Sequence, residues 1–201
     1  MPTILSHAAV PLALGLGLGK ELIPRRVMWA GVALSILPDL DVLAFRLGIP
    51  YANALGHRGF SHALLTAFAV AALMARLLEK PATRRFTGTW LFLFIAMASH
   101  GLLDTLTTGG LGIALLWPKS EHRFFAPWQV IRVSPLSLQR FMDGRGLAVL
   151  YSELLWIWLP GLAVASALWS GRQLWHIASR RCMRHTIPPE PASVDMNSAE
   201  R

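Results

Sequence analysis

Five long apolar runs restrict what this chain can fold into. They extend over residues 7–19, 27–45, 60–78, 87–106 and 147–170, separated by short polar or basic segments. The chain is 54% hydrophobic and only 15% charged, whereas average usage is about 45–50% apolar and ~25% charged. The runs do not alternate with the period of a strand, and a backbone that crosses a membrane must satisfy its own hydrogen bonds. We therefore predict an all-α fold, a polytopic membrane helical bundle with four to five membrane helices.

The chain is expected to form one integral membrane domain over residues 1–172, followed by a basic and then disordered tail over residues 173–201. The first run is short for a membrane span, which needs about 20 residues, so we expect a short, tilted or re-entrant helix there. Cys182 is the only cysteine, which excludes a disulfide within the chain, and its position in the basic tail argues against a metal-binding role.

Lysine and arginine residues are unevenly divided between the two ends of the runs. If the runs cross the membrane alternately, eleven of these residues fall on one side and seven on the other. The positive-inside rule assigns the richer side to the cytoplasm. Because topology explains where the basic residues lie, the net charge of +8 does not lead us to expect nucleic acid as a partner.

Histidine and aspartate residues gather at the other, outer side. They begin or end the first four runs at that side: His7, Asp39, Asp41, His57, His62, His100 and Asp104. A charged side chain costs about 2.5–3.5 kcal/mol at the centre of a membrane helix, so such carboxylates need a cation or hydrogen-bond donors beside them. Nitrogen and oxygen ligands of this kind suit a divalent cation such as zinc or manganese. We predict a site that holds one or two metal ions.

The two closely spaced pairs leave alternatives open. His100 and Asp104 share one face of a helix, where they can bind one metal, or Asp104 can orient His100, or the pair can only tie helices together. Asp39 and Asp41 cannot share a face of a regular helix. Either Pro38 breaks that geometry, or one aspartate binds the metal while the other supports a ligand.

These segments resemble the YdjM-like family of bacterial inner-membrane proteins, which are described as membrane-bound metal-dependent hydrolases. The resemblance covers about residues 6–135 and is carried by these motifs: Ser6-His7, Pro38-Asp39-Leu40-Asp41, Gly56-His57-Arg58-Gly59-Phe60-Ser61-His62 and Ser99-His100-Gly101-Leu102-Leu103-Asp104. The His and Asp motifs are also distantly similar to zinc-dependent phospholipase C. A second His-x-x-x-Glu after Asp104 is missing, so the expectation stays at one or two metals.

The resemblance implies roles for individual residues. The expected metal ligands are His7, Asp41, His57, His62, His100 and Asp104, with zinc as the first choice of metal and manganese as the alternative. Asp39 is the expected base or supporting group. Arg58 is expected to pair with a substrate phosphate, because guanidinium offers two parallel donors, and the turn at residues 107–110 to supply hydroxyl and amide donors. The alternatives are that Arg58 is only an interfacial anchor and that the turn at residues 107–110 is an ordinary loop.

The expected function is hydrolysis of a phosphate ester of a lipid or lipid-linked substrate at the outer face of the bacterial inner membrane. A metal-activated water would be the nucleophile. The alternatives are a non-enzymatic membrane protein, such as a metal or lipid transporter, and a purely structural use of His–Asp bonds. Glu153 and His122 receive no predicted role, and the sequence does not indicate an oligomeric state.

Overall fold

A computed structural model describes residues 1–81, 83–135 and 138–186 of the chain. Regular structure within these residues is helical, apart from two isolated β-bridges that join Thr107 to Ile131 and Ile113 to Phe124. The prediction of an all-α membrane bundle is confirmed for the described part of the chain.

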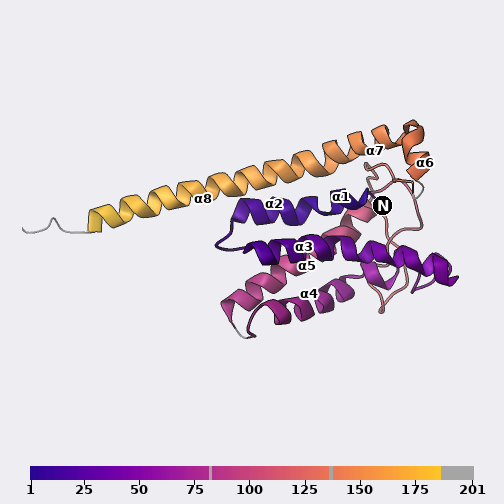
Figure 1. Cartoon of the computed structure of the whole chain (residues 1–201), viewed down its shortest axis with the longest axis horizontal. Helices are drawn as coiled ribbons and strands as arrows, with labels where there is room; N and C mark the ends of the chain where they lie inside the picture. The colour runs from indigo at the N-terminus through magenta and orange to yellow at the C-terminus, as the bar shows by residue number, and fades with distance from the viewer. Residues whose placement is uncertain (82, 136–137, 187–201) are drawn as a thin grey trace, which may run out of the picture. The chain divides into compact units, whose positions relative to one another are not determined.

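The N-terminal helices correspond to the first four apolar runs (Figure 1). They are α1 (Ile4–His7), α2 (Ala9–Leu18), α3 (Arg25–Ile36), the 3-10 helix η1 (Leu37–Leu47), the 3-10 turn η2 (Phe60–His62), α4 (Leu64–Leu78) and α5 (Arg84–Thr105). After a long connection follow α6 (Leu138–Arg140), the π-helix η3 (Phe141–Arg145), α7 (Gly146–Glu153), the π-helix η4 (Leu154–Trp158) and α8 (Leu159–Thr186).

Three continuous helical segments among the described residues are long and apolar enough to cross a membrane. They are Arg25–Leu47, Arg84–Thr105 and Gly146–Arg180, and two shorter apolar segments, Ile4–Leu18 and Leu64–Leu78, accompany them. Together these five segments match the five apolar runs. The first is short, as predicted, and it contains the break between α1 and α2.

Small residues let the helices of the bundle approach closely. On α4, Ala67, Ala71 and Ala75 recur every four residues, are buried and belong to the apolar core shared with α3 and α5. On α3, a Cβ atom at Gly31 would lie 2.6 Å from the ring of Phe92 on α5. This close contact explains why α5 lies against both α3 and α4 (Figure 1).

Pro38 marks the change from α3 to η1. Proline has no N–H for the α-helical hydrogen bond and fixes its own φ angle, and the chain continues from Leu37 as a 3-10 helix with three residues per turn. Asp39 is buried in this helix, whereas Asp41 turns toward the loop that precedes η2.

The described chain forms two units by its internal contacts, Met1–Trp169 and Ser170–Arg201. Every element that contributes to the site below belongs to the first. Residues 173–186 of the predicted tail are helical, as the last part of α8. Residues 187–201, where the tail was expected to be disordered, lie outside the described residues.

Candidate metal centre

The loop before η2 bends sharply, and this bend brings its histidines to the interior. A Cβ atom at Gly59 would lie 2.1 Å from the carbonyl oxygen of Ala54, and one at Gly56 would lie 2.3 Å from that of Pro50. Only glycine fits at such distances. Between them, Arg58 has a φ angle of 64°, in the left-handed region. The loop therefore closes on itself.

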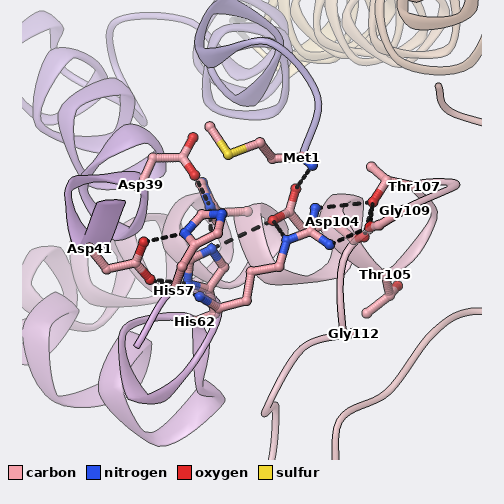
Figure 2. A network of polar contacts seen from close by, with 12 residues as sticks. Met1, Asp39, Asp41, His57, His62, Asp104, Thr105, Thr107, Gly109 and Gly112 are labelled. Atoms are coloured by element: carbon pink, nitrogen blue, oxygen red, sulfur yellow. Dashed lines mark hydrogen bonds and ion pairs between the residues drawn. The ribbon is translucent and has the colours of Figure 1, made fainter. Parts of the chain in front are cut away.

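Four buried side chains from three elements converge beside this loop (Figure 2). They are Asp39 of η1, His62 of η2, and His100 and Asp104 of α5, each between 0 and 4% exposed. One ligand atom from each lies within 4.8 Å of all the others. The Nε2 atoms of His62 and His100 are 3.0 Å apart, Asp39 Oδ1 is 3.4 Å from His100 Nε2, and Asp104 Oδ2 is 3.5 Å from His62 Nε2.

The far nitrogen of each imidazole faces an acceptor. His100 Nδ1 donates to the carbonyl oxygen of Ser35 at 2.7 Å, and His62 Nδ1 lies 3.2 Å from Asp41 Oδ2. With the Nδ1 protons held there, both Nε2 atoms direct lone pairs at each other across 3.0 Å. Two such lone pairs repel unless a proton or a metal ion lies between them. This is also the arrangement by which proteins orient metal-binding histidines.

Asp41 lies behind the histidines and holds their loop. Its carboxylate accepts from the Ser61 hydroxyl at 2.6 Å and from the backbone N–H of Arg58 at 3.0 Å, and it contacts His57 Nδ1 at 2.5 Å. His57 is buried, and its ring lies 5.9 Å from the ring of His62. Asp41 and His57 are outside the four-residue group, so their predicted role as ligands stays a prediction.

His7 of α1 joins the cluster from another side. Its ring stacks on that of His100 with 3.7 Å between centroids, and its Nε2 lies 3.7 Å from Asp39 Oδ2 and 3.8 Å from Asp104 Oδ1. Each of these carboxylates thus turns one oxygen toward the His62–His100 pair and the other toward His7.

Several polar atoms of the cluster have no hydrogen-bond partner among the described residues. They are both ring nitrogens of His7 and all four carboxylate oxygens of Asp39 and Asp104. A buried polar group without a partner costs about 1–3 kcal/mol, and more if it is charged. A cation bound between His62 and His100 would satisfy one oxygen each of Asp39 and Asp104, and a second beside His7 Nε2 would satisfy the other two, so the donor set fits a metal ion.

Arg58 is used within the protein. It is 1% exposed, its Nε lies 3.1 Å from Asp104 Oδ2, and it donates to the Gly109 carbonyl at 2.7 Å and the Thr107 hydroxyl at 3.1 Å (Figure 2). The Thr107 hydroxyl in turn donates to the carbonyl of Asp104. A Cβ atom at Gly110 would lie 2.3 Å from Arg58 Nη1, so the turn needs glycine there. The geometry therefore joins Arg58 and the turn at residues 107–110 to Asp104, while their predicted contacts with substrate stay untested.

The charge of His62 depends on the carboxylates beside it. Burial by itself lowers its pKa, but the carboxylates of Asp104 and Asp41, 3.5 Å and 3.2 Å from its ring nitrogens, outweigh burial and raise the pKa to about 9. Nearby, the amino group of Met1 lies 4.0 Å from Asp104 Oδ1, and burial lowers the pKa of this amine to about 6. Without a metal the site therefore keeps a proton on His62 at neutral pH.

Two contributors, the Ser35 carbonyl and Arg123, have no signal in the sequence, whereas Glu153 stands out there as an acid within an apolar run. The Ser35 carbonyl acts through the backbone, which any residue carries. Arg123 donates to the carbonyls of Tyr51 and Asn53 at 3.1 Å each and of His57 at 3.2 Å, yet in the sequence it is one more basic residue of a loop. Glu153, without a predicted role, is buried against the N-terminal segment. His122 is exposed and contacts Phe124.

A family model described as "YdjM inner membrane protein" matches residues 1–178. The chain belongs to the YdjM family. The family resemblance predicted from the motifs is thereby confirmed. Within this family, the chain is similar to the inner membrane protein YbcI of Escherichia coli (strain K12), with 49% identity over 173 residues, which cover 86% of this chain and 100% of the relative. No solved structure matches the chain.

Membership of the YdjM family agrees with the apolar helices of the structure. The protein is a multi-pass inner membrane protein, as predicted. Its buried group of Asp39, His62, His100 and Asp104 can hold a metal ion. Which side of the membrane this group faces stays a prediction from the distribution of basic residues.

Proposed function

We propose that the protein is a membrane-bound, metal-dependent hydrolase that cleaves a phosphate ester of a lipid or lipid-linked substrate. The observation that carries the proposal is the convergence of two imidazole nitrogens and two buried carboxylates, Asp39 and Asp104, with a ligand atom of each within 4.8 Å of all the others. Two nitrogen and two oxygen ligands suit zinc first and manganese second. Zinc bound there would lower the pKa of a coordinated water toward ~7 and polarise a phosphoryl oxygen.

Each residue of the group has a distinct part in this proposal. His62 and His100 bind through Nε2, because Asp41 and the Ser35 carbonyl hold their Nδ1 protons. Asp104 binds through Oδ2, and Arg58 beside it limits the build-up of negative charge. His7 lies by the second oxygens of both aspartates, where a second ion would find its ligands. One ion at the four-residue group is the minimum, and two is the maximum that the ligands support.

The geometry favours exchanging the roles expected for the two aspartates. Asp39 faces the group and Asp41 faces the back of His62, so we assign Asp39 as a ligand and Asp41 as a positioning residue. Asp39 keeps its predicted part as base as well. Its Oδ1 lies toward His100, so with a single ion bound, Oδ2 would be the oxygen that accepts a proton from the attacking water. With a second ion bound beside His7, Oδ2 would be a ligand instead.

An apolar cavity beside the site supports a lipid substrate. It has a volume of about 450 Å³ and lies between η1, α4 and α5, with side chains such as Ala44, Val70 and Met97 in its lining. Its lining includes the polar side chains of Asp41 and Ser61, which contact the Nδ1 side of His62. Ligand pockets have volumes of about 300–1,000 Å³ and mostly apolar walls with a few polar groups. The tail of a membrane lipid matches this lining.

A metal or lipid transporter is the alternative, and the core argues against it. A transport path needs polar side chains through the full depth of the membrane. The half of the bundle nearer the basic segments is filled by an apolar cluster that includes Val27, Ala75 and Phe92. The His and Asp residues lie at the opposite end of the same helices, which suits a site at one face better than a path.

The test combines metal content with a hydrolysis screen on purified protein. We expect the wild type to hold at least one equivalent of metal and to release phosphate or a phosphorylated headgroup from a lipid phosphate ester, with activity lost on adding a chelator. His100→Ala should lose both metal and activity. The matched control is His122→Ala, which removes an exposed histidine outside the group. Unchanged metal content in His100→Ala would contradict the assignment.

A further inference from the structure

Glu153 is a buried carboxylate for which the proposed reaction has no use. It is the only acidic residue of the apolar run at residues 147–170, and it is 1% exposed. An ionisable residue within a membrane segment is costly and normally has a partner and a function. Its partners are all at the other end of the chain: it accepts from the Ser6 hydroxyl at 2.7 Å, from the Thr3 hydroxyl at 2.6 Å and from the Thr3 N–H.

These contacts hold the helix that carries His7. Ser6 precedes His7 on α1, and its hydroxyl also accepts from Trp158 Nε1 at 3.0 Å. The four-residue α1 has no side-chain cap, and a helix this short is not stable by itself. α1 also packs against α3 and α5, and Glu153 and Trp158, from α7 and η4, add hydrogen bonds that fix its side-chain positions at Thr3 and Ser6.

His7 has little else to fix its position. Neither of its ring nitrogens has a hydrogen-bond partner among the residues that the structure describes. Its ring is held by stacking on His100 and by the backbone of α1. The direction of His7 Nε2 toward Asp39 and Asp104 therefore depends on where α1 is anchored.

We infer that Glu153 is a positioning residue that holds His7 in the cluster by anchoring Thr3 and Ser6. The last membrane segment then positions one residue of a cluster that is formed by α1, η1, η2 and α5. The significance of His7 as a metal ligand rests on the proposed function, but the anchoring itself does not.

The test measures the chemical accessibility of each histidine in the purified full-length protein, stripped of metal and held in lipid nanodiscs. Diethyl pyrocarbonate modifies accessible imidazoles, and mass spectrometry of peptides gives the rate at each position. In the wild type, exposed His122 should react fast, while buried His7, His62 and His100 stay protected. In Glu153→Gln the charge is gone. Depending on how the amide is oriented, either the Thr3 and Ser6 hydroxyls, which both donate to Oε2, or the Thr3 N–H, which donates to Oε1, loses its acceptor. Modification of His7 alone should accelerate by about tenfold or more, the factor expected for one hydrogen bond to a charged group.

Two variants complete the comparison. Glu153→Ala removes the acceptor entirely and should expose His7 further. Glu79→Gln changes a carboxylate that pairs with Arg26 at a distance of 2.9 Å, far from α1 in the sequence, and should leave His7 protected. Unchanged protection of His7 in both Glu153 variants overturns the inference. Equal exposure of His7, His62 and His100 also overturns it, because it would mean general loosening and not anchoring of α1.

Cobalt binding separates this inference from the proposed function. Co²⁺ reports its ligands through its visible absorption. Glu153→Gln should change the Co²⁺ spectrum in the same way as His7→Ala, and the double variant should show no further change, because residues that act through one another are not additive. Additive changes overturn the inference. A wild type that binds no Co²⁺ contradicts the proposed function, while the accessibility of His7 still decides whether Glu153 anchors it.

Discussion

At the scale of single residues, the cluster is defined by which atom each side chain turns inward. His62 and His100 direct Nε2 to the centre because Asp41 and the Ser35 carbonyl take their other nitrogens. Asp39 and Asp104 each turn one carboxylate oxygen toward this pair of nitrogens, at 3.4 Å from His100 Nε2 and 3.5 Å from His62 Nε2. We therefore expect substitutions of Asp39 and of Asp41 to affect metal binding differently, although the two residues are only two positions apart.

Asp39→Asn should abolish stoichiometric metal binding, because an amide is a far weaker ligand than a carboxylate. Asp41→Asn should keep the stoichiometry and lower metal affinity about 10–100-fold, the usual effect of losing a group that orients a ligand. Competition with a coloured chelator measures both. The opposite ranking, with binding lost in Asp41→Asn and kept in Asp39→Asn, would return the ligand role to Asp41.

Metal affinity should rise with pH. The pKa of His62 is raised to about 9 by Asp104 and Asp41, so the metal-free site holds a proton there at lower pH. Metal binding must release this proton. The apparent affinity should therefore increase up to about tenfold per pH unit and level off near pH 9. Chelator competition between pH 6 and 9 measures it, and a flat profile would show that His62 is not a ligand.

Some features of the cluster can be predicted from the sequence and others cannot. Topology and spacing indicate which segments meet, because the His and Asp residues of the first four runs fall at one end of each run. They do not indicate which aspartate turns inward, because this depends on the 3-10 helix that begins around Pro38. Arg123 acts on backbone carbonyls, which have no sequence identity, so its role was not predictable.

At the scale of elements, the loop before η2 is the part most dependent on its exact sequence. Gly56 and Gly59 make close contacts within it, and Arg58 between them has a positive φ angle. Arg123, from a distant loop, donates hydrogen bonds to backbone carbonyls of this loop. The length and apolar character of the helices can be predicted from the sequence pattern, whereas the hydrogen bonds from Arg123 to the loop cannot.

Gly59→Ala should destabilise the protein, because a Cβ atom would lie 2.1 Å from the Ala54 carbonyl oxygen. Forcing atoms into filled space costs about 1–3 kcal/mol. Gly88→Ala is the matched control on α5, where a Cβ atom meets nothing within 4 Å, and alanine should stabilise the helix by about 0.5–1 kcal/mol. Thermal unfolding in detergent should show opposite shifts of midpoint; equal shifts would mean that the loop tolerates a side chain at residue 59.

Arg123→Ala should loosen the loop at residues 51–58 and weaken metal binding without removing a ligand. Hydrogen bonds from a charged group contribute about 1.5–3 kcal/mol each, and the partial exposure of Arg123 places the effect at the lower end. Limited proteolysis and metal affinity measure it. Arg132→Ala, which removes an exposed guanidinium, is the control. If Arg123→Ala and Arg132→Ala have the same protease sensitivity and the same metal affinity, the hydrogen bonds of Arg123 do not stabilise the loop.

At the scale of the whole molecule, five apolar helical segments place all contributors to the cluster at one end of the spans. Family membership makes the protein an inner membrane protein, and the excess of lysine and arginine at the opposite ends predicts that the cluster faces outward. The fold class was predictable because it follows from hydrophobicity, and the inner-membrane localisation was predictable from the family resemblance of the motifs.

Orientation can be tested with single thiols in a chain whose Cys182 is replaced by serine. His122→Cys and Lys80→Cys introduce thiols at exposed positions on the two predicted sides. In cells with a permeabilised outer membrane, a membrane-impermeant thiol reagent should label the first variant and spare the second until the inner membrane is opened. Labelling in the reverse order would put the cluster on the cytoplasmic side.

The proposed function depends above all on whether His62, His100, Asp39 and Asp104 hold a metal together. X-ray absorption of the zinc-loaded protein tests this directly. We expect two imidazole nitrogens at about 2.0–2.1 Å with oxygen ligands at about 2.0–2.2 Å, and one imidazole fewer in His100→Ala. A zinc ion with no imidazole ligand, or the same imidazole count in His100→Ala, would contradict it.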